Sequence, residues 1–409
     1  MNLRDSTDLS LRFRAQLENH FKKAFGIMPT ADPSDAYYNQ VWVRDAVHAS
    51  LNYYIDELPQ AFEDTFVTIL RHQTQEGALP LRVEREYLLL KLVPGLRWLA
   101  RPAFWLIEHI VRGRKERPVY TGEDFNGARD TVPLIIMAAH RYSLSPEGGA
   151  FIGDRYKALL RAYRYFTRTY PTHGGLIELP QSTNDWADSI LRGGKLGLIN
   201  VLWAQSQKAM YELALLNEDD DTAQEAAARF VEARTALRDL YESAGYVRAS
   251  VGDERVDTVA SIMHSLFFLT PEEAVGMQEL LKKHVRRGAG LINFDPPYAA
   301  KDIYWVFKVI GHGGYHTAYA WPWVTLQNIM VKIQIARNHR DEAMRATYKR
   351  EAQQDFSDMS QLFIESDGAY EIYFADTRKP AQTIFYKPPR FFLANLATWE
   401  RVRMELDGI

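Results

Sequence analysis

One stretch organises the chain, and it reads STNDWADSILRGGK from Ser182 to Lys195. It places two carboxylates, Asp185 and Asp188, on either side of Trp186, and an apolar run typical of a helix follows from Leu196 to Leu216. An indole face packs well against a pyranose ring, and a carboxyl beside an apolar ring can keep its proton near neutral pH. The stretch therefore fits a sugar-binding loop at the mouth of a helix. Its simpler interpretation is a capped helix start with a surface tryptophan.

The rest of the chain repeats this succession of loop and helix. Apolar residues at helical spacing predict about twelve helices, mostly in consecutive pairs, with few strands. The predicted helices span Leu9–Phe25, Val43–Ile55, Leu58–Gln73, Asp130–Tyr142, Phe151–Tyr170, Leu196–Leu216, 218–243, Val256–Leu269, Pro271–Val285, Thr317–Asn338, Asp341–Ile364 and Pro388–Leu406.

Loops rich in polar and aromatic residues recur after every second predicted helix. This rhythm predicts an all-α fold in which helix pairs close into an (α/α)6 barrel. An α-solenoid is the alternative, although no repeat of fixed length is visible. Since no linker or change of composition divides the sequence, we expect a single catalytic domain over residues 1–409.

Composition excludes several functional classes. The 409 residues are 46% hydrophobic and 25% charged, with a net charge of -3, so no basic footprint for nucleic acid is present. The absence of cysteine rules out disulfides, thiolate metal sites and a thiol nucleophile. The N-terminus lacks the apolar region of a signal peptide, and no uninterrupted apolar run reaches about 18 residues. We therefore expect a cytoplasmic protein.

Residues 86–117 form an apolar insertion between the predicted helix pairs. Its densest part, Tyr87–Val111, contains three consecutive leucines, two tryptophans and Phe104, but several basic residues and prolines interrupt it. We predict a helical lid over the barrel mouth or a contact in a homo-oligomer, because an exposed apolar patch of that size is unusual on a monomer. Binding at a membrane surface is the less favoured interpretation.

Candidate site residues lie in four groups of loops. The first contains Trp42, Arg44 and Asp45. The arginine and the aspartate, beside an indole, can each form two hydrogen bonds with sugar hydroxyls. In the second, Asp130 opens a helix, where the helix dipole is expected to lower its pKa. An internal ion pair or a helix cap would explain either loop equally well.

The third group is the opening stretch, and the fourth is split along the sequence. One part, His312–Trp323, is dense in aromatic and imidazole rings, and the other sets Glu371 between aromatic residues. A metal site built on His312 and His316 would need both on one helix and a third ligand, whereas two glycines lie between them. We expect no metal and no organic cofactor.

The motifs of these loops, taken in order, resemble the glucosidase domain of glycogen debranching enzymes. More broadly they are similar to the (α/α)6-barrel glycosidases that include trehalase, processing α-glucosidase and plant-type neutral invertase. The similarity extends from Tyr37 to the C-terminus. It is carried by Trp42-Val43-Arg44-Asp45, Asp185-Trp186-Ala187-Asp188, Arg192-Gly193-Gly194-Lys195, Ile199-Asn200-Val201-Leu202-Trp203, Tyr315-His316-Thr317-Ala318-Tyr319-Ala320-Trp321-Pro322-Trp323 and Glu371-Ile372.

This resemblance implies an inverting exo-glycosidase that acts on α-glucosides. Asp188 would be the general acid and Glu371 the general base that activates water. The terminal sugar would be held by Trp42, Arg44, Asp45, Asp130 and Trp321, with Trp186 and His316 near the scissile bond. Asp185 and Lys195 would complete the substrate-binding set.

The sequence also departs from the family pattern. Leu198 stands where the family has glutamate before Ile-Asn, and Ala318 stands where it has glycine after histidine. A trehalase-like alignment would place the acid at Asp185, and the neutral invertases suggest Asp130. Neutral-invertase-like and mannosyl- or glucosylglycerate-type hydrolases remain alternatives. Two alternatives outside the hydrolases also remain: a sugar epimerase that uses His312 and His316, and an oligosaccharide-binding barrel.

Overall fold

The computed structural model describes residues 3–32, 38, 40–84, 116–123, 127–242 and 244–409. The insertion predicted at 86–117 lies outside these residues apart from 116 and 117. Its expected role as a lid or a subunit contact therefore stays a prediction.

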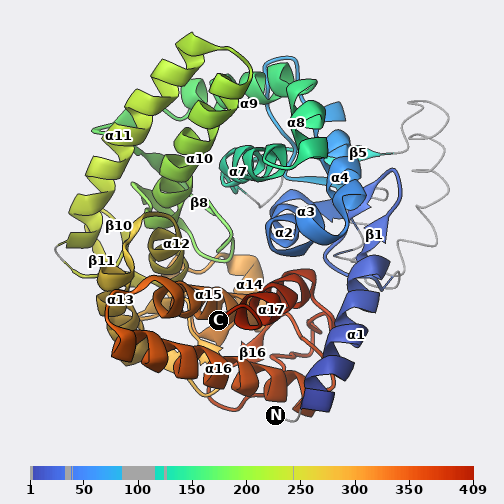
Figure 1. The fold of residues 1–409 in the computed structure, drawn as a ribbon, viewed down its shortest axis with the longest axis vertical. Helices are drawn as coiled ribbons and strands as arrows, with labels where there is room; N and C mark the ends of the chain where they lie inside the picture. The colour runs from blue at the N-terminus through green and yellow to red at the C-terminus, as the bar shows by residue number, and fades with distance from the viewer. Residues whose placement is uncertain (1–2, 33–37, 39, 85–115, 124–126, 243) are drawn as a thin grey trace.

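The described helices form two concentric rings, as Figure 1 shows. Each inner helix contacts the next one along the chain, and the last contacts the first, so the inner ring is closed. The inner ring consists of α2 (Val43–Ala49) with its continuations η1 (Ser50–Tyr54) and α3 (Ile55–Glu57), followed by α7 (Thr131–Ser143), α10 (Gly197–Leu216), α12 (Thr258–Phe268), α15 (Pro322–Asn338) and α17 (Leu393–Leu406).

An outer helix packs against each member of the inner ring. The N-terminal helix covers the last inner helix, so the two ends of the chain complete the barrel together. The predicted all-α (α/α)6 barrel is thus confirmed. The outer helices are α1 (Leu3–His20), α4 (Pro59–Arg71), α9 (Tyr156–Thr169), α11 (Asp220–Glu242), α13 (Pro271–His284) and α16 (Glu342–Glu365), and the short α8 (Pro146–Gly153) lies beside α7.

Residue patterning explains the two rings. On the outer helix α9, Leu159, Tyr163 and Phe166 share a buried face, whereas Arg161 and Arg164 on the other side are exposed. This spacing is that of an amphipathic surface helix. The inner helix α10 instead buries nearly every residue of its first three turns, as expected for a helix enclosed on all sides.

Short antiparallel strands brace the loops between the helices. Few strands were expected, but the described residues contain sixteen, each only two to five residues long. The sheets are β1 (Phe21–Lys22) with β2 (Gly26–Ile27); β3 (Val41–Trp42) with β4 (Arg82–Glu84) and β5 (Arg117–Val119); β6 (Thr172–His173) with β7 (Leu176–Ile177); β8 (Leu179–Ser182) with β9 (Arg192–Gly194); β10 (Arg248–Ser250) with β11 (Asp253–Asp257) and β14 (Phe294–Asp295); β12 (Arg286–Arg287) with β13 (Gly290–Leu291); and β15 (Tyr319–Ala320) with β16 (Tyr373–Phe374).

Several predicted helix bounds were wrong. The first helix ends at His20 and not at Phe25, because residues 21 and 22 pair as β1 with β2, and the last begins at Leu393 and not at Pro388. The helix predicted over Phe151–Tyr170 is instead two helices: α8 begins at Pro146, because Ser145 caps it and Pro146 suits its first position, and α9 follows from Tyr156. A side chain at Gly148 would collide with the carbonyl of Tyr142, so the glycine permits close packing. The helix expected from Thr317 begins only at Pro322, because residues 319 and 320 pair as β15 with β16.

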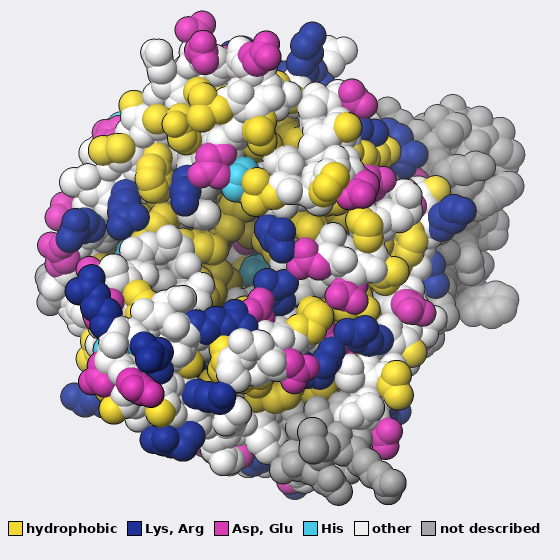
Figure 2. Space-filling model, viewed as in Figure 1, with side chains coloured by type: hydrophobic (Ala, Val, Ile, Leu, Met, Phe, Trp, Pro, Cys, Tyr) yellow, Lys and Arg dark blue, Asp and Glu magenta, His cyan; other side chains and the backbone are white. Residues whose placement is uncertain are grey.

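The face seen in Figure 2 carries lysine, arginine, aspartate and glutamate side chains interspersed, without a large patch of one sign. Among the described residues, no helix combines the length and the apolar character needed to cross a membrane.

Candidate active site

The loops that precede the inner helices enclose a cavity of about 840 Å³. Three inner helices begin at residues that line it, namely Trp42 before α2, Trp321 before α15 and Phe392 before α17. The loop that leads into α10 adds Trp186 and Asp188, and the segment before α17 adds Glu371. Residues far apart in the sequence therefore meet at one end of the barrel.

Aromatic rings form one wall of this cavity. The Trp186 ring meets those of His316, Trp321 and Trp323 edge-on, with centroids 5.0, 5.3 and 5.0 Å away. The His316 imidazole stacks on Trp321 with an interplanar angle of 10°. Such rigid apolar faces suit the flat face of a sugar ring, and they exclude water from neighbouring carboxyls.

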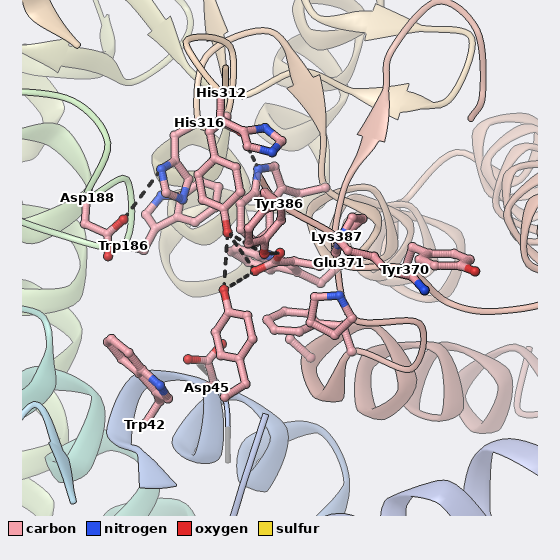
Figure 3. Close-up of a pocket in the computed structure, with 18 of the residues that line it drawn as sticks. Trp42, Asp45, Trp186, Asp188, His312, His316, Tyr370, Glu371, Tyr386 and Lys387 are labelled. Atoms are coloured by element: carbon pink, nitrogen blue, oxygen red, sulfur yellow. Dashed lines mark hydrogen bonds and ion pairs between the residues drawn. The ribbon is translucent and has the colours of Figure 1, made fainter. Parts of the chain in front are cut away.

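Asp188 lies in this apolar surrounding, at one side of the cavity in Figure 3. Burial raises the pKa of Asp188 to about 7, opposed by the Arg44 guanidinium and reinforced by the carboxyls of Asp130, Asp45 and Asp185. A carboxyl with that pKa can carry a proton at neutral pH, which a general acid requires.

The nearest imidazole does not neutralise Asp188. His316 Nδ1 lies 3.8 Å from Asp188 Oδ1, but it accepts a hydrogen bond from the Ser189 backbone N–H at 3.3 Å and lies 2.9 Å from the Ser189 hydroxyl. Burial, together with the charges of Arg44 and Arg192, lowers the pKa of His316 well below its usual value. The ring is therefore neutral and forms no ion pair with Asp188.

Glu371 is fully buried on another side of the cavity (Figure 3) and is held by three phenols. Its Oε1 accepts hydrogen bonds from Tyr38 and, at 2.8 Å, from Tyr315, and its Oε2 accepts one from Tyr386. Burial raises the pKa of Glu371 to about 8, and the three hydrogen bonds oppose that rise because they favour the ionised form. The phenols fix the carboxylate in one orientation.

A third carboxyl, Asp45, also lines the cavity, beside Arg44. Burial raises the pKa of Asp45 to about 6, so its side chain is ionised at neutral pH. Arg44 Nε donates to Asp130 Oδ2 at 2.7 Å, and Asp130 is buried behind it. Asp130 therefore acts on the cavity through Arg44. Its pKa was expected to be lowered by the helix dipole, but burial raises it.

Asp185 and Lys195 are not among the described residues that line the cavity. Asp185 is fully buried, where both of its oxygens accept from Arg192 Nη2 at 2.7 and 2.6 Å and Oδ1 also accepts from the Ala187 N–H. Arg192 Nη1 in turn lies 3.5 Å from Asp257 Oδ2. Asp185 thus shapes the loop that carries Asp188, whereas Lys195 is only half-buried at the start of α10.

Sequence reasoning did not assign a role to several residues of this site. Tyr315 directly precedes the assigned His316, and Tyr38 stands four residues before the assigned Trp42. Tyr386 follows an unremarkable Thr-Ile-Phe segment, and nothing in that segment points to Glu371. His48 and Trp323 also line the cavity, with ring centroids 5.0 Å apart.

No group of three or more histidine, aspartate or glutamate side chains among the described residues is arranged to hold a metal ion. His312 and His316 both line the cavity. Burial lowers the pKa of His312 to about 4 and that of His316 well below its usual value, so both rings are neutral near pH 7.

Solved structures with this architecture include several glycoside hydrolases. A GH63 mannosylglycerate hydrolase from Thermus thermophilus, in complex with Tris and D-glycerate, matches over 96% of this chain and 99% of its own, with 14% identity and a TM-score of 0.59. A rhamnosidase from Klebsiella oxytoca with rhamnose bound matches 99% of this chain and 64% of its own, at 11% identity and a TM-score of 0.63. A protein described as a glycosidase matches 100% and 99%, at 14% identity and a TM-score of 0.62.

The chain has the (α/α)6-barrel fold of these glycoside hydrolases. No protein-family model and no curated protein sequence matches it. With this fold, the cavity lies where the loops before the inner helices converge, and it contains the motif residues Trp42, Arg44, Trp186, Asp188 and Glu371.

Proposed function

We propose that this protein is an inverting exo-glycoside hydrolase that acts on α-glucosides by general acid and base catalysis. One observation carries the proposal: two buried carboxyls with raised pKa values, Asp188 and Glu371, face an aromatic cavity from different loops of an (α/α)6 barrel. Pairs of titratable groups with tuned environments are typical of acid and base roles.

In the proposed reaction, Asp188 donates its proton to the glycosidic oxygen while the bond from that oxygen to the anomeric carbon breaks. Glu371 accepts a proton from a water molecule whose oxygen attacks the anomeric carbon from the opposite face. The products are an alcohol and a sugar of inverted configuration. This route requires the two carboxyls to be about 6.5–9.5 Å apart, so that the water fits between base and sugar.

The remaining cavity residues would orient the terminal sugar. Asp45, ionised at neutral pH, can accept hydrogen bonds from sugar hydroxyls, and Arg44, held by Asp130, can donate to them. Trp42, Trp186 and Trp321 offer ring faces or edges to the apolar side of the sugar. His316, as a neutral ring fixed by Ser189, would position the substrate beside Asp188.

The identity of the sugar is the first point to test. Incubation with α-glucosides, α-mannosides, sucrose and glycosylglycerates, followed by detection of free monosaccharide, distinguishes the proposed activity from its alternatives. Release of glucose from α-glucosides is expected. Formation of an isomer without hydrolysis would favour an epimerase, and binding without any product would favour an oligosaccharide-binding barrel.

A further inference from the structure

A tight turn at the cavity mouth, Thr383–Tyr386, carries two apolar residues at its tip. The Thr383 N–H donates to the Tyr386 carbonyl at 2.9 Å, and the Tyr386 N–H donates to Thr383 Oγ1 at 3.1 Å. The tip residues Ile384 and Phe385 are 95% and 72% exposed. Glycine, proline, asparagine, aspartate and serine dominate turn tips, so neither turn geometry nor burial accounts for this pair.

The turn is attached to a second exposed apolar segment. Thr383 Oγ1 donates to the Ile310 carbonyl at 3.0 Å, directly after the short helix α14 (Trp305–Val309). Trp305 and Val309 of this helix are 61% and 66% exposed. We refer to Trp305, Val309, Ile384 and Phe385 as the apolar rim.

One residue of the apolar rim, Phe385, reaches the cavity that contains Asp188 and Glu371. Phe385 lines this cavity together with Val306, Phe307 and Ile310, which belong to α14 or follow it. Trp42, Arg44 and Asp45, by contrast, belong to the start of inner helix α2. A sugar held near α2 would leave the part of the cavity beside Phe385 and α14 for its leaving group.

Two charged residues beside the rim have protein partners. Arg390 forms an ion pair with Asp367, and Lys308 donates to the Ala300 carbonyl at 3.3 Å. Lys387 follows Tyr386 and lines the cavity with its exposed side chain, so an anionic leaving group is the competing occupant.

We infer that the apolar rim is a binding site for an apolar leaving group, an alkyl or aryl aglycone, of the glycoside that the enzyme cleaves. The inference rests on the proposed function, since it assigns the leaving-group side of the same cavity. The turn also links this site to the base, because Tyr386 closes the turn and donates its hydroxyl hydrogen bond to Glu371.

The test measures how affinity depends on the length of the leaving group. Methyl to pentyl α-glucosides, and the same series of α-mannosides, are titrated calorimetrically into the Asp188→Asn variant, and kcat/KM is measured with the wild-type protein. These alcohols have nearly equal acidity, so chain length changes contact and not leaving-group reactivity. For half-covered methylenes, we expect the dissociation constant to fall and kcat/KM to rise about two-fold per added carbon.

Substitutions locate the effect. Phe385→Ser and Ile384→Ser, each combined with Asp188→Asn for the titration, should flatten the dependence on chain length, with the larger effect at Phe385, which lines the cavity. The matched control is Leu144→Ser, which removes a leucine that is 62% exposed at the opposite end of inner helix α7 from Asp130. It should leave the dependence unchanged.

Three results would overturn the inference. The first is a flat dependence on chain length in the unsubstituted rim. The second is tighter binding of glycosylglycerates than of pentyl glycosides that is lost in Lys387→Ala. The third is sedimentation as a dimer that Ile384→Ser dissociates, which would make the rim a subunit interface. Chain-length-dependent binding without hydrolysis of any glycoside would instead refute the proposed reaction and leave the apolar subsite standing.

Discussion

The two aspartates that flank Trp186 are expected to respond in opposite ways to the same isosteric substitution. Asp188 lines the cavity with a pKa raised to about 7, whereas Asp185 is fully buried and bonded to Arg192 through both oxygens. Asp188→Asn should therefore remove activity and preserve the fold, and Asp185→Asn should weaken the fold and hurt activity less.

The magnitude for Asp188→Asn follows from linkage. A carboxyl whose folded-state pKa is raised from 3.8 to about 7 binds its proton more tightly in the folded state. The wild-type protein therefore loses stability as the pH rises from about 4 to 7, by up to about 4 kcal/mol at about 1.4 kcal/mol per pKa unit. Asparagine has no such charge to bury, so the variant should be more stable than wild type above pH 7. Loss of a general acid costs about 10²–10⁴-fold in rate.

The magnitude for Asp185→Asn follows from the ion pair that it breaks. The Arg192 guanidinium would remain buried, with the longer contact to Asp257 at 3.5 Å as its remaining carboxylate contact. Removing one partner of a buried pair costs about 3–5 kcal/mol, which in a chain of this length lowers Tm by roughly 4–6 °C. We expect kcat/KM to fall less than ten-fold when it is measured well below that temperature.

The assay combines thermal unfolding at pH 5 and pH 8 with kcat/KM on an unactivated α-glucoside. Relative to wild type, Asp188→Asn should melt higher at pH 8 than at pH 5, because more of the wild-type penalty is present at pH 8, and its kcat/KM should fall about 10²–10⁴-fold. The reasoning is refuted if Asp185→Asn is fully folded and inactive while Asp188→Asn retains activity. That result would make Asp185 the acid, as the trehalase-like alignment proposes.

Three further predictions concern the base. Glu371→Ala should lose activity by orders of magnitude, because the attacking water is no longer activated. Azide should partly restore turnover of an activated glycoside by this variant. A variant that turns over as fast as wild type without azide would remove Glu371 from the mechanism. Activity needs protonated Asp188, whose pKa is about 7, together with ionised Glu371, whose pKa is about 8. This combination is a minority form whose fraction is largest between the two values, so the pH profile of kcat/KM should be a narrow bell that rises to about pH 7 and falls above about pH 8. The Tyr386 hydrogen bond lowers the Glu371 pKa, so Tyr386→Phe should raise that pKa. The maximum of the bell should fall and its alkaline limb should move to higher pH. An unchanged profile would speak against this role.

The sequence predicted the helices well where local signals and burial agree. The run expected over Leu196–Leu216 forms α10 from Gly197 to Leu216, and the run expected over Pro271–Val285 forms α13 from Pro271 to His284, with Thr270 as its cap. The ring closure that joins α1 to α17 depends on contacts between the two ends of the chain. Only the rhythm of loops and helix pairs indicated it in advance.

The site was predictable where motifs mark it and not where separate loops meet. Trp186 and Glu371 could be found from their neighbours in the sequence. The phenols of Tyr38, Tyr315 and Tyr386 could not be assigned to Glu371, because they come from three loops that only the closed barrel brings together.

The pKa of Asp130 shows a second limit of sequence reasoning. Its place at a helix start predicts a lowered value, but burial behind Arg44 raises it. The depth at which a helix terminus is buried is a tertiary property, and here it outweighs the helix dipole.

Proton NMR of the sugar first released from an α-glucoside tests the central claim most directly. If Glu371 activates a water molecule on the face opposite Asp188, the β-anomer appears first, and the α-anomer grows in only by mutarotation. An initial burst of α-anomer would show retention of configuration, and it would contradict the assignment of Asp188 and Glu371 as an inverting acid and base.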